Sequence, residues 1–347
     1  MECLAREWLL TGSILGVLST ALFLQRWPHL DTSDLEVVWL IGVLLVAVNG
    51  LQQSGLMHRL TWWLETGSHA PVKLVLGVYF LSMLVTNDVA LVVAVPITLM
   101  METQHKERLV ILEALAANAG SALSPIGNPQ NLYIYWHYQP DPLTFVREIA
   151  PFSLFFLALL VILPVSLSSR PVSPGQHPKP PLHASTWRNA GLLLLTIACV
   201  LGWIPFLWSL VVPLYAAMFD RESLKIDFIL LTTLITFFLL TDNITIMLGG
   251  AIRHPEHIFL LTALGSQLIS NVPATLLVSG YTNNWQALLW GASVGGFGSL
   301  MGSLANLIAY RLYIAQNRQS ASRFAAMFLI TGGIAFCLGT LLFFCRG

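Results

Sequence analysis

The stretch AANAGSALSPIGNPQNLYIY, residues 116–135, interrupts a long apolar run with glycine, serine, proline and asparagine. Apolar sequence continues on both sides of it, so the interruption lies at membrane depth. Backbone N–H and C=O groups that a helix break frees are tolerated at that depth only inside protein or beside a water-filled cavity. The stretch therefore predicts a broken transmembrane helix with a solute site beside it.

A second copy of this stretch follows 175 residues later, as ASVGGFGSLMGSLANLIAY at residues 292–310. The shift pairs identical residues: Gly120/Gly295, Ser124/Ser299, Gly127/Gly302, Asn131/Asn306, Leu132/Leu307 and Tyr135/Tyr310. A short polar turn precedes each copy, Thr86-Asn87-Asp88 before the first and Ser270-Asn271-Val272 before the second. The chain therefore reads as a duplicated membrane protein.

Composition agrees with this reading. Hydrophobic residues make up 56% of the 347 residues and charged residues only 10%, which is typical of an all-α polytopic membrane protein. The 17 basic and 17 acidic residues balance, so nothing suggests nucleic acid as a partner. The four cysteines show no ligand spacing, and we expect no cofactor and no metal other than a coupling sodium ion.

The polar turns predict two re-entrant hairpins. If residues 73–101 formed one span, Asp88 would lie near the bilayer centre, where a carboxylate costs about 2.5–3.5 kcal/mol. A hairpin leg of about a dozen residues spans roughly 18 Å at 1.5 Å per residue. That is too short for a hydrocarbon core of about 30 Å, but it reaches the middle. Residues 257–281 form the second candidate, with Ser270 and Asn271 at its tip.

The distribution of basic residues sets the orientation. With both hairpins re-entrant, thirteen Lys and Arg residues share one side and four lie opposite, at Arg26, Arg147, Arg253 and Arg346. This bias predicts a cytoplasmic N-terminus and an outer C-terminus in a bacterial-type inner (plasma) membrane. After residue 50, Arg59, Trp62 and Trp63 suit a helix lying in the membrane interface.

The predicted organisation is two inverted repeats, each with a re-entrant hairpin and a broken helix, giving about nine spans plus two hairpins. Residues 1–168 form the N-terminal repeat and 206–347 the C-terminal one. Residues 169–188, rich in proline, form a cytoplasmic linker. An inverted second half must begin outside, so residues 189–205 supply one linking transmembrane helix.

The paired motifs resemble the ion transporter superfamily over nearly the whole chain. This superfamily groups divalent anion/sodium symporters, arsenite efflux permeases, citrate carriers and bacterial sodium/proton antiporters. The motifs are GLQQSG (50–55), TNDVALVVAVP (86–96), IGNPQNL (126–132), SNVPATLL (270–277) and GSLANLI (302–308). The TND turn is most similar to small, uncharacterised anion permeases. The resemblance implies a dimerising scaffold and a transport domain that moves like an elevator and carries both hairpins and both broken helices.

The resemblance also implies the site residues. Asn87 and Asn271 match tip asparagines that touch substrate and cation, and Thr86 and Ser270 match the tip hydroxyls before them. The turns at the breaks match segments whose carbonyls ligate cations and whose half-helices favour an anion. The candidate substrate- and cation-binding set is Thr86, Asn87, Asp88, Ser124, Gly127, Asn128, Asn131, Ser270, Asn271, Ser299, Gly302, Ser303 and Asn306. Oxygen ligands of this kind suit sodium. The alternative is that these residues only cap helices and permit close packing.

Acidic residues supply candidates for ion coupling. Asp88 stands where the symporters carry an uncharged residue, and it would repel a dianion unless it is protonated or paired with a cation. It also fits a helix N-cap. Asp242 is a second candidate coupling site or a structural hydrogen-bond partner, and Glu113 is a weaker one.

Function follows as secondary active transport of a small inorganic or organic anion, coupled to sodium or protons. An arsenite-type efflux permease and a sodium/proton antiporter are the alternatives within carriers. A soluble ATPase partner accompanies some arsenite permeases, but nothing in the sequence indicates one here. We expect a homodimer in membrane lipid. A channel or a non-transporting scaffold explains the glycines but not the duplicated breaks, and no HExxH or GxSxG motif supports an enzyme.

Overall fold

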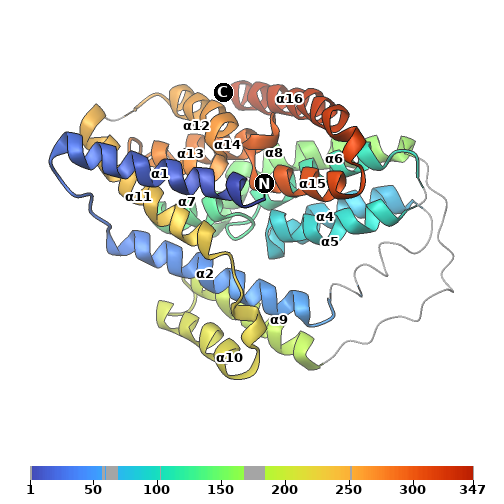
Figure 1. Cartoon of the computed structure of the whole chain (residues 1–347), viewed down its shortest axis with the longest axis horizontal. Helices are drawn as coiled ribbons and strands as arrows, with labels where there is room; N and C mark the ends of the chain where they lie inside the picture. Colours follow the sequence, from blue (N-terminus) through green and yellow to red (C-terminus); the bar gives the residue numbers. More distant parts are fainter. Residues whose placement is uncertain are drawn as a thin grey trace.

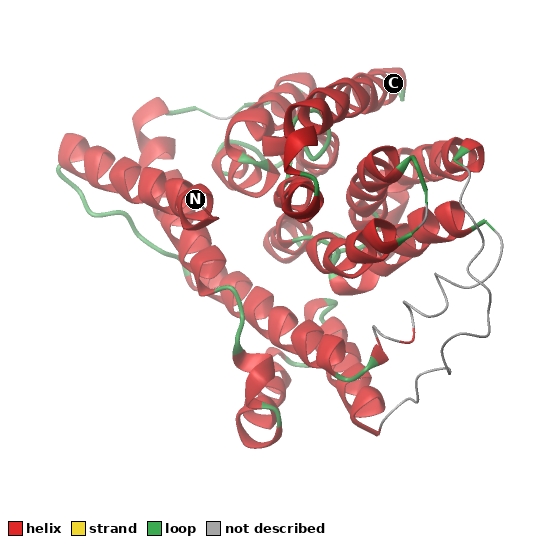
Figure 2. Ribbon diagram, turned by 45° about the vertical axis from the view of Figure 1, so that its right-hand side comes forward, coloured by secondary structure: helices red, strands yellow, loops and turns green. Residues whose placement is uncertain are grey.

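The structure is a computed structural model that describes residues 2–56, 59, 69–101, 103–167, 184–250 and 252–346. Within these residues it contains helices and connecting loops and no β-strand (Figure 2). This confirms the predicted all-helical class. In the part of the chain that the structure describes, four segments are long and apolar enough to cross a membrane: Thr32–Gln53, Pro142–Val165, Arg221–Met247 and Arg318–Cys345.

The first set of helices is here called the long-helix group, and its members extend over the left and the bottom of Figure 1. It consists of α1 (Glu2–Leu24), α2 (Thr32–Gln53), α9 (Ala184–Val200), α10 (Val211–Phe219) and α11 (Phe228–Leu248), with short 3-10 turns η2 (Phe206–Leu210) and η3 (Arg221–Leu224). Helix α1 packs along α11, while α2 contacts α9, α10 and α11. Large apolar side chains on α9 and α10 remain exposed, as lipid-facing helices require.

The second set, here called the hairpin group, contains both predicted hairpins. Hairpin 1 is α4 (Ala70–Val85) and α5 (Asn87–Met100), and hairpin 2 is α12 (Pro255–Ile269) and α13 (Asn271–Ser279). In each hairpin the two legs pack against each other, and one residue, Thr86 or Ser270, separates them. The prediction that residues 73–101 fold back on themselves is therefore confirmed.

Both broken helices also lie in the hairpin group. The first is α6 (Lys106–Ala122) followed by α7 (Pro129–Tyr138), and the second is α14 (Trp285–Gly295) followed by η4 (Leu300–Gly302) and α15 (Leu304–Gln316). Proline at the first position of α7 fits a helix start, where its missing N–H is not needed. Helices α8 (Pro142–Ile162, then η1, Leu163–Ser166) and α16 (Ala321–Cys345, after η5, Arg318–Ser320) complete the group.

The two hairpins meet the two broken helices through matching glycines. A Cβ on Gly120 would lie 2.0 Å from the carbonyl oxygen of Tyr79 on α4, and one on Gly295 would lie 2.4 Å from Ser266 Oγ on α12. Any side chain at these positions would therefore push the hairpin leg away. This packing, α4 on α6 and α12 on α14, brings each tip to a break.

The linker and the linking helix predicted from the sequence differ from the structure in their bounds. The linker prediction covers 169–188, but α9 already begins at Ala184, so the last residues of that range are helical, and the helix predicted to end at residue 205 ends at Val200. The rest of the predicted linker, together with Trp62 and Trp63 of the predicted interface helix, lies outside the described residues.

Candidate functional site

Both hairpin tips adopt the same rare backbone conformation. Thr86 has φ 77° and ψ 154°, and Ser270 has φ 73° and ψ 154°. This region of dihedral space is almost confined to glycine, and a residue with a side chain there carries about 1–3 kcal/mol of strain. Such strain persists only where the surroundings impose it, and it gathers at functional sites. The matched angles show that the two tips are built alike.

Hairpin 1 inserts its tip into the first break. The backbone N–H of Asn87 donates to the carbonyl of Gly127 at 3.2 Å. The Asn87 side-chain amide donates to Asn118 Oδ1 at 3.3 Å and approaches Ser303 Oγ, in the second half of the chain, at 3.5 Å. Asn87 is 4% exposed. One buried side chain thus joins hairpin 1 to both breaks.

Hairpin 2 reaches the same place from the other side. The Asn271 amide donates to the carbonyl of Ala292 at 3.4 Å. A Cβ built on Gly296 would lie 3.1 Å from Asn118 Oδ1 and 3.2 Å from Asn271 Nδ2. The two tip asparagines therefore converge on Asn118 and Gly296. We call Asn87, Asn118, Asn271, Ser303 and Asn306 the amide cluster, because Asn118 Nδ2 also donates to Asn306 Oδ1 at 2.8 Å.

A cavity opens beside this cluster, between the hairpin group and the long-helix group. It is lined by tip and break residues together with α1 and α11: Trp8, Leu9, Asn87, Asp88, Pro129, Gln130, Asp227, Ile229, Leu230, Thr233, Leu234, Ser270, Asn271, Val272, Pro273, Met301, Ser303, Leu304 and Leu307. Its volume is about 80 Å³, far below the roughly 300–1,000 Å³ of pockets for drug-sized ligands. The cavity suits a small solute.

Four helices begin at this cavity. The first residues of α5, α7, α13 and α15, namely Asn87, Pro129, Asn271 and Leu304, all line it. Each helix N-terminus acts as roughly half a positive charge. Two carboxylates line the cavity as well, but Asp227 accepts from the N–H of Leu230 at 3.1 Å and so caps α11. The four helix dipoles together correspond to roughly two positive charges, against one negative charge on Asp88. The remaining positive charge favours the binding of one small anion.

Asn131 and Asn306 each span one break, Asn131 the first and Asn306 the second. The Asn131 amide donates to the carbonyls of Ser121, Ala122 and Ser124 at 3.0–3.1 Å. The Asn306 amide donates to the carbonyls of Gly296 and Ser299 at 2.8 and 3.0 Å. In both breaks the asparagine binds the carbonyls of the residues ten and seven positions before it in the sequence. These asparagines satisfy freed carbonyls, so they hold the breaks in shape from behind the cavity lining.

The other predicted residues of the breaks also stand behind the lining. Asn128 donates through Nδ2 to Ser121 Oγ at 2.8 Å. Ser124 Oγ accepts from the N–H of Ile126 at 3.3 Å. A Cβ on Gly127 would lie 2.2 Å from the carbonyl of Ser121, and one on Gly302 would lie 2.5 Å from that of Phe297, so both turns exclude side chains. The N–H of Ser299 donates to Gln267 Oε1 at 2.8 Å.

The two acids near the tips differ in position. Asp88 lies in the first turn of α5, whose N-cap is Thr86, so the alternative of Asp88 as the N-cap is wrong. Its backbone N–H donates to Asn87 Oδ1 at 2.9 Å, and the residue lines the cavity. Glu113 is fully buried between α5 and α6, where Thr98 Oγ1 donates to its Oε1, and it is not among the cavity-lining residues.

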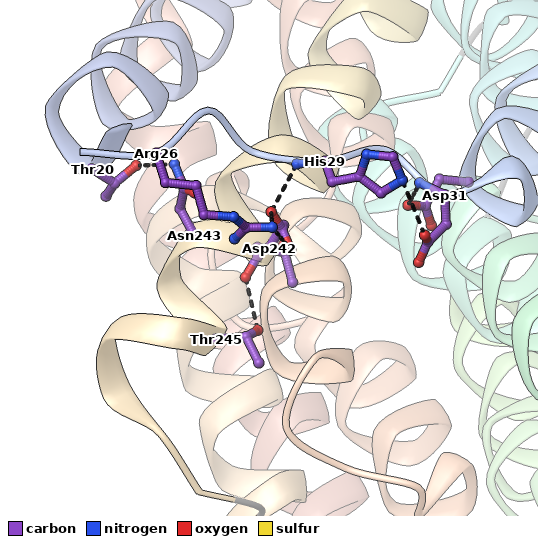
Figure 3. Close-up of polar contacts among 9 residues, drawn as sticks. Thr20, Arg26, His29, Asp31, Asp242, Asn243 and Thr245 are labelled. Carbon is purple, nitrogen blue, oxygen red and sulfur yellow. Dashed lines mark hydrogen bonds and ion pairs between the residues drawn. The ribbon is translucent and has the colours of Figure 1, made fainter. Parts of the chain in front are cut away.

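Asp242 lies away from the amide cluster, at the loop between α1 and α2. Its carboxylate forms an ion pair with Arg26 at 3.0 Å and accepts from the backbone N–H of His29 at 2.8 Å (Figure 3). The neighbouring Asn243 donates to Thr20 Oγ1 at 3.0 Å (Figure 3). Of the two roles the sequence left open for Asp242, these contacts support the structural one.

Asp242→Asn is accordingly expected to lower stability slightly and to leave ion dependence unchanged. The ion pair is partly exposed, with side-chain exposures of 39% and 28%, so it contributes about 0.2–1 kcal/mol. Thermal unfolding in detergent measures the loss, and the double exchange Arg26→Asp with Asp242→Arg should recover part of it. A changed ion dependence in Asp242→Asn would return this residue to the coupling machinery.

Sequence reasoning missed several residues of the site. Asn118 lies inside the quoted stretch, but a lone asparagine in a helix carries no positional signal. Trp8 on α1, Asp227 at the N-cap of α11 and Thr233 on α11 come from outside the hairpins and broken helices on which the sequence prediction was based. Among the described residues no three His, Cys, Asp or Glu side chains gather as metal ligands.

Comparisons of the sequence with known proteins identify the family. Residues 7–295 match the citrate transporter family, CitMHS. An uncharacterised transporter of Methanocaldococcus jannaschii is 30% identical over 87% of this chain and 86% of its own length, and the inner membrane protein YbiR of Escherichia coli is 33% identical over 83% and 82%. The silicon efflux transporter LSI3 of Oryza sativa subsp. japonica is 26% identical over 40% of this chain and 31% of its own length.

The structure has apolar helices of membrane-spanning length and hairpins that meet broken helices. The family match covers most of the chain. The chain is a multi-pass membrane transporter that belongs to the citrate transporter family of the ion transporter superfamily.

Proposed function

We propose that this protein is a secondary active transporter that carries a small anion across the membrane, coupled to sodium or protons. The observation that carries the proposal is the convergence of four helix N-termini and both tip asparagines on one small cavity. N-terminal dipoles favour an anion, and the carbonyls and amide oxygens of the breaks suit a hard cation such as sodium. A transporter of this kind has no catalytic residues and no bound cofactor.

An elevator movement fits the division into two groups. The hairpin group packs tightly within itself, and its contacts with the long-helix group run mainly through α13 on α11 and α7 on α2. In this mechanism the hairpin group carries the solute and the long-helix group stays fixed. The exposed apolar faces of α9 and α10 are then available to lipid and to a second copy of the chain in a homodimer.

Inverted repeats provide the proposed topology, with residues 1–168 and 206–347 as the repeats and residues 189–205 in the linking helix. The matched tip angles, the matched glycine contacts and the matched amide bridges of Asn131 and Asn306 support it. The charge bias then puts the N-terminus in the cytoplasm and the C-terminus outside, with about nine spans in a bacterial-type inner membrane.

Cysteine labelling tests this topology. Lys73 lies in the first turn of α4, and Lys106 is the first residue of α6, so the two residues lie at the two ends of hairpin 1. Single cysteines at both positions should react with a membrane-impermeant maleimide only from the cytoplasmic side. Cysteine at Arg147, near the start of α8, serves as the outward-facing control. Labelling of residues 73 and 106 from opposite sides would show that hairpin 1 crosses the membrane and would reverse the charge argument.

The charge and the volume of the cavity limit which solutes it can bind. Among the residues that the structure describes, no lysine, arginine or histidine lines the cavity, and Asp88 offsets part of the helix-dipole field. A small anion of low charge fits both limits better than a tricarboxylate such as citrate. A second candidate is efflux of a weak inorganic acid, favoured by the same carboxylate and by the relative named as a silicon efflux transporter.

Transport by purified protein in proteoliposomes tests the proposal. We expect saturable movement of a small anion that responds to an imposed sodium or pH gradient. The panel should include citrate, phosphate, sulfate, arsenite and silicic acid, each with both gradients and in both directions. Flux that does not saturate would indicate a channel, and no flux of any solute would leave a scaffold role.

A further inference from the structure

The two breaks are closed in different ways, and the difference centres on Gln267. This residue lies on α12, three residues before the tip residue Ser270. Its Nε2 donates to the carbonyls of Gly295 at 2.8 Å and Ala263 at 3.1 Å, and its Oε1 accepts from the N–H of Ser299 at 2.8 Å. A side-chain amide from hairpin 2 therefore fills the second break.

The second break needs this donor because its backbone turns differently. At the first break the carbonyl of Gly120, the counterpart of Gly295, accepts from the N–H of Leu123 at 3.1 Å. The counterpart of Leu123 is Gly298, which has φ 81° and donates to the carbonyl of Gly332 on α16 at 3.0 Å. Gly295 thereby loses its backbone donor, and Gln267 supplies one.

Among the described residues, hairpin 1 places no amide at the matching position of the first break. The position three residues before its tip is Met83, which cannot donate a hydrogen bond. Two amide oxygens at this break, Asn128 Oδ1 and Asn131 Oδ1, are buried without a donor among the described residues. Their amide nitrogens both bind Ser121, at 2.8 and 3.1 Å, so both side chains are oriented by the same residue.

Uncharged oxygens of this kind are ligands for a hard cation. Amide and carbonyl oxygens do not titrate, so a proton cannot occupy the place, whereas sodium is bound by such groups. Asn128 and Asn131 are 3% and 0% exposed, so a cation there would lie inside the protein. Asp88 follows Asn87, whose backbone N–H donates to the Gly127 carbonyl of this break at 3.2 Å, so hairpin 1 carries a compensating negative charge next to the residue that enters the break.

The family resemblance implies a cation at each break; we propose that at the second break the amide of Gln267 takes the place of that ion, so that only the first break holds a sodium ion. Each chain then couples solute movement to a single sodium ion. This inference rests on the proposed transport function, because the breaks are taken as the places where coupling ions bind.

Counting bound sodium tests the inference without knowledge of the solute. Equilibrium binding of ²²Na⁺ to the purified full-length protein in detergent should saturate at one ion per chain. Asn128→Ala should abolish this binding. Gln267→Ala frees the Gly295 carbonyl. The same break contains Ser299 Oγ, which is buried without a donor among the described residues. This variant should bind two ions.

Matched substitutions at Met83 keep the test decisive. Met83→Ala, at the same place on hairpin 1, should still bind one ion, while Met83→Gln should bind none because its amide would enter the first break. Gln267→Ser serves if Gln267→Ala does not fold. Zero or two ions on the wild-type protein, or a single ion on both Gln267 variants, would overturn the inference. Wild-type protein that binds one ion yet moves no solute in proteoliposomes would refute the proposed transport function instead.

Discussion

Replacing either tip asparagine, Asn87→Ala or Asn271→Ala, is expected to abolish transport. The physical reason is that these two side chains enter the same buried place from opposite hairpins and both line the cavity. An alanine removes the only side-chain amide that each tip offers to a solute or to a neighbouring cation. Initial rates in proteoliposomes, with the solute identified by the panel, measure the effect.

The two variants should differ in stability. Asn87→Ala removes the donor that reaches the buried Asn118 Oδ1 at 3.3 Å, so it should cost about 1–3 kcal/mol. Asn271→Ala removes one long bond of 3.4 Å to a backbone carbonyl and should stay close to wild type. Asn317→Ala is the matched control, because its amide also makes a 3.4 Å bond to a carbonyl, that of Tyr313, outside the amide cluster.

Normal transport by both tip variants would contradict the site assignment. The asparagines would then act as structural residues at the ends of helices, which is the alternative that the sequence left open. If Asn87→Ala loses transport because it unfolds, the result for Asn271→Ala decides the test, because this variant is expected to stay folded.

Asp88→Asn is expected to separate transport from its driving ion. Asp88 is the carboxylate at the tip of hairpin 1 and lines the cavity, and a charge that crosses the membrane uncompensated is costly. In each state that moves, the carboxylate therefore holds a proton or lies beside a cation. Asparagine keeps the shape and removes the charge, so the imposed ion gradient should no longer drive uptake. Asp88→Ala should be more damaging, since alanine also removes a polar group from the first turn of α5.

Asp227→Asn provides the control for this experiment. Asp227 lines the same cavity, but its carboxylate caps α11 through the N–H of Leu230, and asparagine caps a helix about as well as aspartate. This variant should therefore keep the ion dependence of the wild type. If Asp88→Asn also keeps it at an unchanged rate, the coupling ion must be held by the uncharged oxygens of the breaks alone.

The sequence by itself was sufficient for the features that depend on local chemistry. Serine, proline, glycine and asparagine interrupt the apolar sequence at residues 124–130, serine and glycine interrupt it at residues 299–303, and polar turns interrupt apolar runs at Asn87 and Asn271. Such residues interrupt helices wherever they cluster, so the hairpins and the breaks were predicted correctly, and the tip residues that line the cavity were among those named. The family resemblance that these motifs carry was also confirmed.

Only the tertiary structure decided what each polar side chain contacts. Asn118 joins the amide cluster, Asn131 and Asn306 bind freed carbonyls, Asp242 pairs with Arg26 and Gln267 fills the second break. Two of these contacts, Asn118 with Asn306 and Asp242 with Arg26, join residues more than a hundred positions apart, and a helical pattern does not specify which neighbour will be packed against it. An amide or a carboxylate fits a binding site and a structural bridge equally well by its chemistry alone, so the choice between them depends on the partner that the fold brings within hydrogen-bonding distance.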